Sequence, residues 1–326
     1  MRAVRQYEFG PAENLRYEEV PDPHPGPGQV RIAVAASGVH LVDTVIRAGV
    51  ARGPFPLPEL PMTPGREVAG VVDEVGEGID ESRLGRRVVA HLGMASGGYA
   101  ELAVTGVGAL HELPADLDPA AAVAMVGTGR MTMGILELAC LTADDVALVT
   151  SAAGGTGTLL VQAALNAGAA VVGVAGGPAK VERVRKSGAH IAVDYTAPDW
   201  PEEVRRELDG REVTVAFDGV GGEAGRAAMD LLGPGGRIVL FGFSSGEPTS
   251  FTSADLFRRG LSAVVALGPR IMNLPGGLRA LEERSLAEAA AGRLVPAVQA
   301  FALKDAAAAH AALESRATSG KVVLLP

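Results

Sequence analysis

The hydrophobic pattern changes character after about residue 120. Before that point it consists of short apolar runs separated by Gly, Pro and Asp, and the runs at 29–36, 68–72 and 87–90 predict β-strands. From about Pro119 onward, apolar runs of strand length alternate with segments of helical period. The first part therefore predicts a partly open β-barrel, and the second predicts a doubly wound sheet of parallel strands.

The elements expected in the second part follow one another in alternation. Strands are expected at 147–150, 169–174, 191–193, 213–216, 238–240 and 263–267, and helices at 120–125, 131–141, 159–165, 276–292 and 304–316. A last apolar run at 322–325 is expected to complete the sheet of the first part. The chain is therefore interpreted as an α/β protein, with a Rossmann-type domain at 121–267 and a β-barrel domain built from 1–120 and 268–326.

A glycine-rich turn follows the first strand of the second part. The run at 147–150 is succeeded by Ala152-Ala153-Gly154-Gly155-Thr156-Gly157, and an apolar segment of helical period begins at Leu159. Glycines allow a tight turn and a close approach of phosphate, and the N–H groups of the helix N-terminus attract that phosphate. Glycine clusters also form ordinary turns, but the order strand, turn, helix, strand favours a dinucleotide site.

The end of the next strand indicates which dinucleotide binds. NAD-binding domains carry a carboxylate there for the ribose 2′-hydroxyl, but here the segment reads Ala175-Gly176-Gly177-Pro178-Ala179-Lys180. A lysine attracts the 2′-phosphate that a carboxylate repels. Lys180 is one of only four lysines in the chain, although a solvated residue in the first turn of a helix is the alternative interpretation. NADPH is therefore favoured over NADH.

Composition and charge narrow the class of protein. The 326 residues are 48% hydrophobic and 21% charged, which is typical of a soluble globular protein of about two domains. The net charge of −9 argues against a nucleic-acid partner, and no apolar stretch has the length of a membrane span or the form of a signal sequence. We therefore expect a cytoplasmic protein without a membrane partner. The single cysteine, Cys140, lies in an apolar helical stretch and is expected to be a buried thiol.

A set of short motifs in a fixed order resembles one known family. It includes SGVHLVDTVIRAG at 37–49, PGREVAGVV at 64–72, AAGGTG at 152–157, DGVG at 218–221 and LESRATSGK at 313–321. With these motifs the chain resembles the medium-chain dehydrogenase/reductase superfamily, and within it the zinc-free quinone oxidoreductase (zeta-crystallin-like) branch. The resemblance implies a GroES-like catalytic domain joined to a Rossmann domain. It also implies a homodimer, in which a strand near 263–267 pairs across a twofold axis.

The resemblance further implies which residues bind the cofactor. The glycine turn matches the pyrophosphate site, Lys180 and Tyr195 match contacts on the adenosine side, and Arg316 matches an arginine that reaches the 2′-phosphate. Alternatively, Tyr195 caps a sheet edge and Arg316 pairs with Glu314. Thr128 and the segment 241–244 match positions at the nicotinamide end. The expected cofactor-binding residues are Thr128, Ala153, Gly154, Gly155, Thr156, Gly157, Gly176, Lys180, Tyr195, Phe241, Phe243, Ser244 and Arg316.

The zinc ligands of the related alcohol dehydrogenases are missing. Those enzymes hold zinc with thiolate, imidazole and carboxylate ligands. Here His40 stands where they carry Cys, Leu41 where a His would help, and Arg66 replaces the His of a Gly-His-Glu motif. The cysteine cluster of their structural zinc is absent as well, because Cys140 is the only cysteine. We therefore expect no metal, and a hydride transfer from NADPH to the activated double bond of a quinone or an enone.

His40 is the candidate catalytic residue. The branch commonly carries Asn at this position, Tyr where this chain has Val45, and a second Tyr near Val50. Imidazole both donates and accepts protons near neutral pH, so His40 can replace a tyrosine as proton donor. Alternatively, it only hydrogen-bonds a ribose hydroxyl or a backbone carbonyl. Asp43 is expected to cap the following helix rather than to act as a base. The two valines predict a roomier, more apolar pocket and hence a bulky or apolar enone.

Two further functions remain open. The first is an enoyl-thioester reductase of polyketide or fatty-acid type, whose carrier would need a basic groove. Arg47, Arg52 and Arg66 are the candidates for such a groove, unless they are only solvated. The second is a non-catalytic NADPH-binding protein such as a redox sensor, which the missing tyrosines keep in consideration.

Overall fold

The chain forms two compact units. The computed structural model describes residues 1–50, 57–93 and 96–326. Unit 1 comprises Met1–Thr128, Ser285–Gly292 and Pro296–Pro326, and unit 2 comprises Gly129–Arg284 and Arg293–Val295. Compared with the expected domain boundaries, 121–128 are grouped with unit 1, and 268–284 and 293–295 with unit 2. Each unit contains a hydrophobic core of its own.

Unit 2 is built on a sheet of parallel strands. Its strands are β8 (Val146–Val149), β9 (Ala170–Ala175), β10 (Ile191–Asp194), β11 (Val213–Asp218), β12 (Leu232–Leu240) and β13 (Ser262–Val265). They lie in the order β10-β9-β8-β11-β12-β13, and every neighbouring pair is parallel. This is the doubly wound order, and the direction of winding reverses between β8 and β11. Ligands of such sheets bind at this switch point, beyond the carboxyl ends of the strands.

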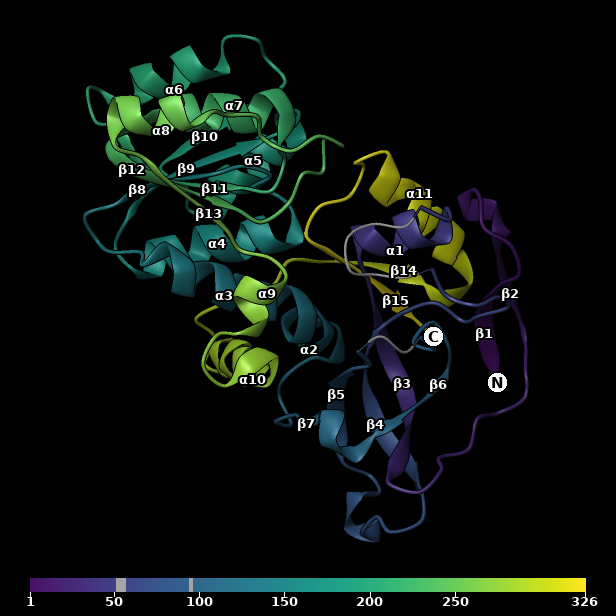
Figure 1. Ribbon diagram of the computed structural model, residues 1–326. Helices are drawn as coiled ribbons and strands as arrows, with labels where there is room; N and C mark the ends of the chain where they lie inside the picture. Colours follow the sequence, from purple (N-terminus) through teal and green to yellow (C-terminus); the bar gives the residue numbers. More distant parts are fainter. Residues whose placement is uncertain (51–56, 94–95) are drawn as a thin grey trace. The chain divides into compact units, whose positions relative to one another are not determined.

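Helices cover both faces of this sheet. They are α3 (Arg130–Ala139), α4 (Gly155–Asn166), α5 (Pro178–Lys186), α6 (Trp200–Leu208), α7 (Gly222–Asp230) and α8 (Ser253–Arg259), followed by α9 (Pro269–Met272) and α10 (Gly277–Ala290). In Figure 1, α4 lies on one face and α6, α7 and α8 lie on the other. Leu148, Val174 and Ile238 are completely buried between these layers. Each buried side chain of this size stabilises the fold by about 1.5–3 kcal/mol.

Unit 1 is built on a mostly antiparallel sheet. Its strands are β3 (Gln29–Val39), β4 (Glu67–Val75), β5 (Arg87–His91), β6 (Leu102–Gly106), β7 (Leu110–Glu112), β14 (Val298–Ala302) and β15 (Lys321–Leu325). The order is β14-β15-β3-β4-β5-β7, with β6 also paired to β3. Within the described residues this path does not close, as in the partly open barrel that the sequence predicts. The expected closing strand is confirmed, because β15 pairs with β3.

Short elements complete unit 1. A separate hairpin joins β1 (Arg2–Gln6) to β2 (Leu15–Glu19). The helices are α1 (Leu41–Arg47), α2 (Pro119–Ala124), a π-helical turn η4 (Met125–Gly129) and α11 (Ala306–Glu314), and the 3₁₀ turns are η1 (Ala12–Asn14), η2 (Glu81–Arg83), η3 (Val107–Ala109) and η5 (Leu303–Asp305). Asp118 begins α2 because its carboxylate accepts a hydrogen bond from Ala121 N at 3.0 Å.

Two expectations about side chains and helix ends are wrong. Cys140 is exposed rather than buried, because α3 ends at Ala139 and Cys140 takes a left-handed conformation with φ +49°. The last helix ends at Glu314 rather than at Arg316, and Arg316 itself has φ +55°. A left-handed residue terminates a helix and turns the chain outward, which neither composition nor apolar period reveals.

Candidate functional site

The glycine turn lies at the carboxyl end of β8. Helix α4 begins at Gly155 with Gly154 as its N-cap, so the glycines belong to the first turn of the helix. A Cβ built on Gly157 would overlap the carbonyl oxygen of Ser151 and lie 2.8 Å from Ala152 Cα. Only glycine fits this position without a shift of the backbone. No side chain caps the N-terminus of α4, so no N-cap side chain competes with a ligand for its first N–H groups.

These features fit the pyrophosphate of a dinucleotide. The N-terminus of a helix carries partial positive charge and unpaired N–H donors, both of which attract phosphate. The missing Cβ of Gly157 lets the helix pack closely against the turn. Gly154 and Gly155 add no side chains at the start of the helix. The predicted residues Ala153, Gly154, Gly155, Thr156 and Gly157 are thus all part of one strand-to-helix turn.

The ends of β9 and β10 lie side by side. A Cβ built on Gly176 would lie 3.4 Å from Tyr195 Oη, so these two predicted residues are neighbours. Gly177 N donates to Asp194 Oδ1 at 2.9 Å, and Thr196 N donates to the same oxygen at 3.0 Å. Burial raises the pKa of Asp194, but these hydrogen bonds outweigh it and hold the pKa below its usual range. Asp194 therefore stabilises the turn after β9. Lys180 lies in the first turn of α5, the helix that follows this turn.

The ends of β8 and β11 are joined by the buried carboxylate of Asp218. Its Oδ1 accepts hydrogen bonds from Thr150 Oγ1 at 2.9 Å and from Val220 N at 2.9 Å. A Cβ built on Gly219 would overlap the ring of Phe241, and Ser244 N donates to Gly219 O at 3.1 Å. The predicted segment 241–244 is thereby packed against the turn that follows β11.

The predicted residues of unit 2 gather at one edge of one sheet. The glycine turn follows β8, Gly176 and Lys180 follow β9, Tyr195 follows β10, and Phe241, Phe243 and Ser244 follow β12. All of these strands are parallel, so their carboxyl ends meet at the same edge. This edge contains the switch point between β8 and β11, where doubly wound sheets bind dinucleotides. The arrangement can hold an extended dinucleotide across the strand ends.

Thr128 and Arg316, the other two residues expected to bind cofactor, belong to unit 1. Thr128 is buried in the π-helical turn η4, an irregularity that is frequent at functional sites. Arg316 is exposed and follows α11. The alternative interpretation pairs Arg316 with Glu314. In the structure the guanidinium of Arg47 binds the carboxylate of Glu314, and it would compete with Arg316 for this carboxylate.

His40 takes part in a cluster of three ionisable groups in unit 1. Its Nε2 lies 2.5 Å from Glu67 Oε1 and 2.9 Å from Lys321 Nζ. Lys321 Nζ also donates to Glu67 Oε2 at 2.8 Å. Glu67 is completely buried and the Lys321 side chain is 4% exposed, whereas the His40 side chain is 25% exposed. His40 is therefore the member of this cluster that meets the surface of the unit.

Burial strongly affects the carboxylate in this cluster. It raises the pKa of Glu67, but the attraction of His40 and Lys321 outweighs it and holds the pKa well below its usual range. Glu67 therefore remains ionised. Sequence reasoning missed both partners of His40. The available signal was a charged residue directly before an apolar run at the start of two strands, β4 and β15, since a buried charge requires a partner.

Asp43 stabilises the N-terminus of α1, but from inside the helix: α1 begins at Leu41 with His40 as its N-cap, rather than at Thr44 after Asp43 as the sequence predicts. Asp43 Oδ2 accepts a hydrogen bond from His40 N at 2.8 Å, and Asp43 Oδ1 accepts one from Arg66 Nη2 at 3.1 Å. Beneath it, Tyr99 Oη lies 3.4 Å from Asp43 Oδ2 and 3.1 Å from His310 Nε2. Arg66, which stands at the position where the zinc enzymes carry a histidine, therefore binds the carboxylate of Asp43.

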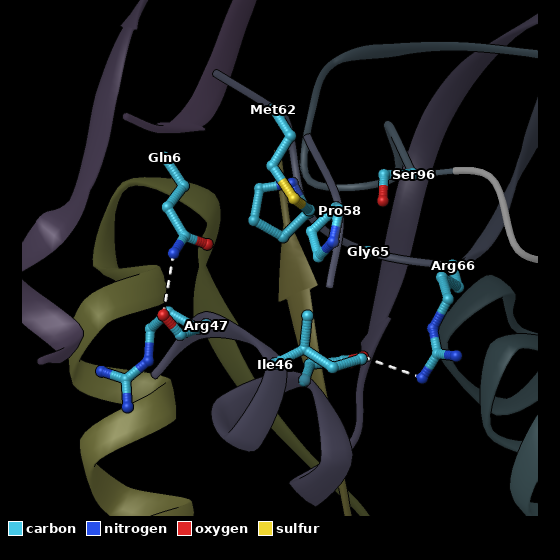
Figure 2. A pocket seen from close by; sticks show the side chains of 10 residues that line it. Gln6, Ile46, Arg47, Pro58, Met62, Gly65, Arg66 and Ser96 are labelled. Atoms are coloured by element: carbon cyan, nitrogen blue, oxygen red, sulfur yellow. Dashed lines mark hydrogen bonds and ion pairs between the residues drawn. The ribbon is translucent and has the colours of Figure 1, made fainter. Parts of the chain in front are cut away.

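A small cavity of unit 1 opens beside this cap. Its volume is about 50 Å³, and its lining includes Asp43, Ile46, Pro58, Met62 and Arg66. Figure 2 shows Ile46 and Met62 approaching it from opposite sides, with Arg66 at its flank. The valines Val45 and Val50, from which a roomier pocket is predicted, do not line this cavity.

Arg47 and Arg66 do not form an exposed basic groove. The Arg47 side chain is 3% exposed and pairs with Glu314, and the Arg66 side chain is 11% exposed and pairs with Asp43. Arg52, the third arginine of the expected groove, lies outside the described residues. The described residues also contain no group of three His, Cys, Asp or Glu side chains arranged to hold a metal ion. In the same part of the chain, no helix is long and apolar enough to cross a membrane.

Two family models match the chain. Residues 26–115 match the alcohol dehydrogenase GroES-like domain, and residues 155–283 match the zinc-binding dehydrogenase domain. The first match covers strands of unit 1, and the second covers the sheet of unit 2 from α4 onward.

Full-length relatives are similar to the chain throughout. A 2-haloacrylate reductase from a Burkholderia species is 34% identical over 335 aligned residues, which cover 100% of this chain and 99% of that protein. A quinone oxidoreductase from Pseudomonas aeruginosa is 32% identical, covering 98% of this chain and 97% of its own. The crystal structure of Escherichia coli quinone oxidoreductase complexed with NADPH is similar with a TM-score of 0.87, at 29% identity and with complete coverage of both chains.

Proposed function

The chain belongs to the quinone oxidoreductase branch of the medium-chain dehydrogenase/reductase superfamily, and we propose on that premise that it transfers hydride from NADPH to a quinone or an α,β-unsaturated carbonyl compound. The observation that carries the proposal is the glycine turn at the switch point of the parallel sheet. That turn and the aligned strand ends fit a dinucleotide. The protein is therefore an NADPH-dependent oxidoreductase.

We propose that unit 2 is the cofactor-binding domain and unit 1 the catalytic domain. The first turn of α4 binds the pyrophosphate, and Lys180, with Tyr195 and Arg316, binds the adenosine 2′-phosphate side. Phe241, Phe243, Ser244 and Thr128 serve the nicotinamide end. When bound, the cofactor supplies a hydride for the β-carbon of the acceptor, and the protein supplies position and a proton.

His40 is the proposed proton donor. Addition of hydride to an enone leaves an enolate, whose negative charge requires a hydrogen-bond donor and then a proton. The imidazolium of His40 gives a proton to this enolate, the N–H bond pair remains on the nitrogen, and water protonates the imidazole again. This role requires a group that meets the surface of unit 1, and His40 is the member of its cluster that does so.

The residues around His40 do not fit a catalytic zinc. Lys321 Nζ lies 2.9 Å from His40 Nε2 and 2.8 Å from Glu67 Oε2, so an ammonium group already occupies the space between the two possible ligands. A divalent cation there would be repelled by this charge, and its ligands would first have to lose their partner. Of the zinc-ligand positions, Arg66 also carries a positive charge. The proposed hydride transfer therefore proceeds without a metal.

We also propose a size class for the acceptor. Val45 and Val50, in place of two aromatic residues, favour a bulky or apolar enone over a small quinone. A strong preference for small benzoquinones over larger enones in steady-state assays would contradict this. The similarity to a 2-haloacrylate reductase favours a second candidate within the same chemistry, a short unsaturated acid, and the same assays compare the two.

We further propose a cytoplasmic homodimer. The edge strand β13 of the parallel sheet carries the exposed side chain of Val265, and Leu267 follows it with 38% of its surface exposed. A free edge with apolar side chains is well suited to pair with a second copy of itself. Light scattering on the purified protein would give twice the monomer mass, and Val265→Lys would reduce it to the monomer mass.

The test of the proposed function is a screen for NADPH oxidation with quinones, enones and enoyl thioesters. Turnover of quinones or enones by the wild type, and its loss by at least tenfold in His40→Ala, would support the proposal. Selective turnover of enoyl thioesters would favour the carrier-dependent reductase, although Arg47 and Arg66 offer no exposed groove for it. Tight NADPH binding without consumption by any acceptor would favour a sensor instead.

A further inference from the structure

Three chain segments far apart in sequence bring His40, Glu67 and Lys321 together. His40 follows β3 and precedes α1, Glu67 is the first residue of β4, and Lys321 is the first residue of β15. The strands β15, β3 and β4 are neighbours in the sheet of unit 1, so the contacts are set by the strand order. The cluster is a product of the fold and does not depend on a flexible loop.

The carboxylate of Glu67 is confined by glycines. A Cβ built on Gly127 would overlap Glu67 Oε1, and a Cβ built on Gly38 would overlap Glu67 Oε2. Both glycines therefore leave room for the carboxylate and pack their backbone against it. Because it is fully buried and tightly packed, Glu67 cannot turn away from His40 when the charge of the imidazole changes.

The two contacts of His40 Nε2 require different protonation states. The contact with Glu67 Oε1 at 2.5 Å is an ion pair and requires the protonated imidazole, because a carboxylate attracts the charged ring and repels the lone pair of a neutral nitrogen. The contact with Lys321 Nζ at 2.9 Å requires a lone pair on Nε2, because ammonium is only a donor. One nitrogen cannot meet both requirements at once, so each neighbour favours one state.

We propose that Glu67 and Lys321 are opposed positioning residues that set the protonation of His40. Glu67 stabilises the imidazolium by the attraction of its carboxylate for the positive charge, and Lys321 stabilises the neutral imidazole by donating a hydrogen bond to Nε2. With a fixed partner for either state, His40 gains and loses its proton without rearrangement of the site. The catalytic consequence rests on the proposed function, whereas the effect on the imidazole is a property of unit 1 alone.

Other charged groups face this cluster. His91 on β5 is the cross-strand neighbour of Glu67, and Arg66 precedes Glu67 on the way into β4. Asp43 on α1 is held by Arg66, and the buried Tyr99 hydroxyl lies against Asp43. These groups influence the protonation of the imidazole in the wild type and in every variant, because none of them is replaced. Shifts of the His40 titration midpoint that have opposite signs in the Glu67 and Lys321 variants can therefore be assigned to these two residues.

The test is an NMR titration of the His40 imidazole in the protein without cofactor. Histidines are labelled with ¹³C at Cε1, and His40→Asn assigns the signal. We expect Lys321→Met to move the titration midpoint up by about one pH unit or more, and Glu67→Gln to move it down by a similar amount. Lys304→Met, which removes an exposed lysine outside the cluster, is expected to leave it unchanged.

Structural damage is separated by a further variant. Removing one member leaves a buried charge unpaired, which is strongly destabilising, whereas Glu67→Gln combined with Lys321→Met removes both charges. The double variant is expected to titrate between the two single variants. Shifts of the same sign, or no shift, in variants that retain the fold would overturn the proposal, whatever the activity assays show.

The pH profile of the active enzyme gives a second readout. If His40 donates its proton, the rate falls as the pH rises through the titration of the imidazole. The alkaline limb of kcat is then expected at higher pH in Lys321→Met and at lower pH in Glu67→Gln, with Lys321→Arg close to wild type. The NMR titration midpoint of His40 could shift in opposite directions in the two variants while the alkaline limb of kcat stays in place. This result would support the positioning role of Glu67 and Lys321 and would contradict His40 as the proton donor.

Discussion

We propose that a single side chain, Lys180, determines the selectivity between NADPH and NADH. The turn after β9 carries no carboxylate of its own, and the carboxylate of Asp194 at the end of β10 accepts hydrogen bonds from Gly177 N and Thr196 N. A carboxylate held in this way orients the backbone, and we propose that Lys180, at the start of α5, is the charge that selects a 2′-phosphate.

Replacement of Lys180 by Ala tests this selectivity. We expect the Kd for NADPH to rise by about tenfold or more, because a charge-assisted hydrogen bond of about 1.5–3 kcal/mol is lost, while the Kd for NADH changes little. Fluorescence titration with both nucleotides measures the ratio. Lys186→Ala is the matched control, since Lys186 ends the same helix and is exposed. An unchanged ratio in Lys180→Ala would contradict the assignment.

The buried imidazole of His310 predicts a pH dependence of stability. Burial lowers the pKa of His310 to about 4 in the folded protein, compared with 6.5 in the unfolded chain. Between these values the unfolded chain binds a proton that the folded protein does not, so the free energy of unfolding decreases as the pH falls from 6.5 to about 4. The loss is at most about 3 kcal/mol. Urea unfolding across this range should show a shallower pH dependence in His310→Gln than in the wild type.

At the scale of elements, the close packing of α4 against the turn after β8 predicts the effect of one methyl group. In Gly157→Ala the added Cβ would overlap the Ser151 carbonyl oxygen, so the turn must move. We expect a loss of about 1–3 kcal/mol in stability and a Kd for NADPH at least tenfold higher. Gly106→Ala is the control, because a Cβ there meets nothing within 4 Å. Equal behaviour of the two variants would argue against the turn as a phosphate site.

The two ends of the parallel sheet are expected to respond differently to loss of a carboxylate. Asp145 precedes β8 and binds Arg237 through two hydrogen bonds, at 2.9 and 2.7 Å. Asp145→Asn should lower stability by about 3 kcal/mol and leave the Kd for NADPH unchanged, because the ligand edge is at the opposite end of the strands. Asp218→Asn, at the carboxyl end of β11, should raise that Kd. Thermal unfolding and nucleotide titration of both variants check the contrast.

The alternation of strands and helices could be predicted because its causes are local. Apolar period, glycine positions and the proline at the start of α2 are all present in short windows of sequence. The predicted strand at 213–216 ends two residues before β11 does. A carboxylate is not part of an apolar run, yet Asp218 is completely buried. Its burial depends on donors from Thr150 and Val220, which only the folded sheet brings to it.

The surroundings of His40 could not be predicted for the same reason. His40 itself was found from its place in a motif, and Asp43 from helix capping, which acts over three residues. Lys321 lies 281 positions away from His40 in the chain and reaches it because β15 pairs with β3. Long-range strand pairing of this kind leaves no local sequence signal.

At the scale of the whole molecule, the chain leaves unit 1 near Thr128 and returns to it for β14, α11 and β15. The returning strand β15 lies between β14 and β3, in the interior of the seven-stranded sheet, and supplies Lys321. The C-terminal segment therefore has both a structural and a proposed catalytic role in unit 1, while the expected cofactor residues other than Thr128 and Arg316 lie in unit 2.

The proposed reaction of the protein is a metal-independent hydride transfer from NADPH to an activated double bond. Its most direct test follows deuterium from position 4 of the nicotinamide of labelled NADPH into an enone, with protein dialysed against a chelator. We expect deuterium at the β-carbon of the reduced product, and we expect no increase of the rate on addition of zinc. Absence of deuterium from the β-carbon, or activity that depends on zinc, would contradict it.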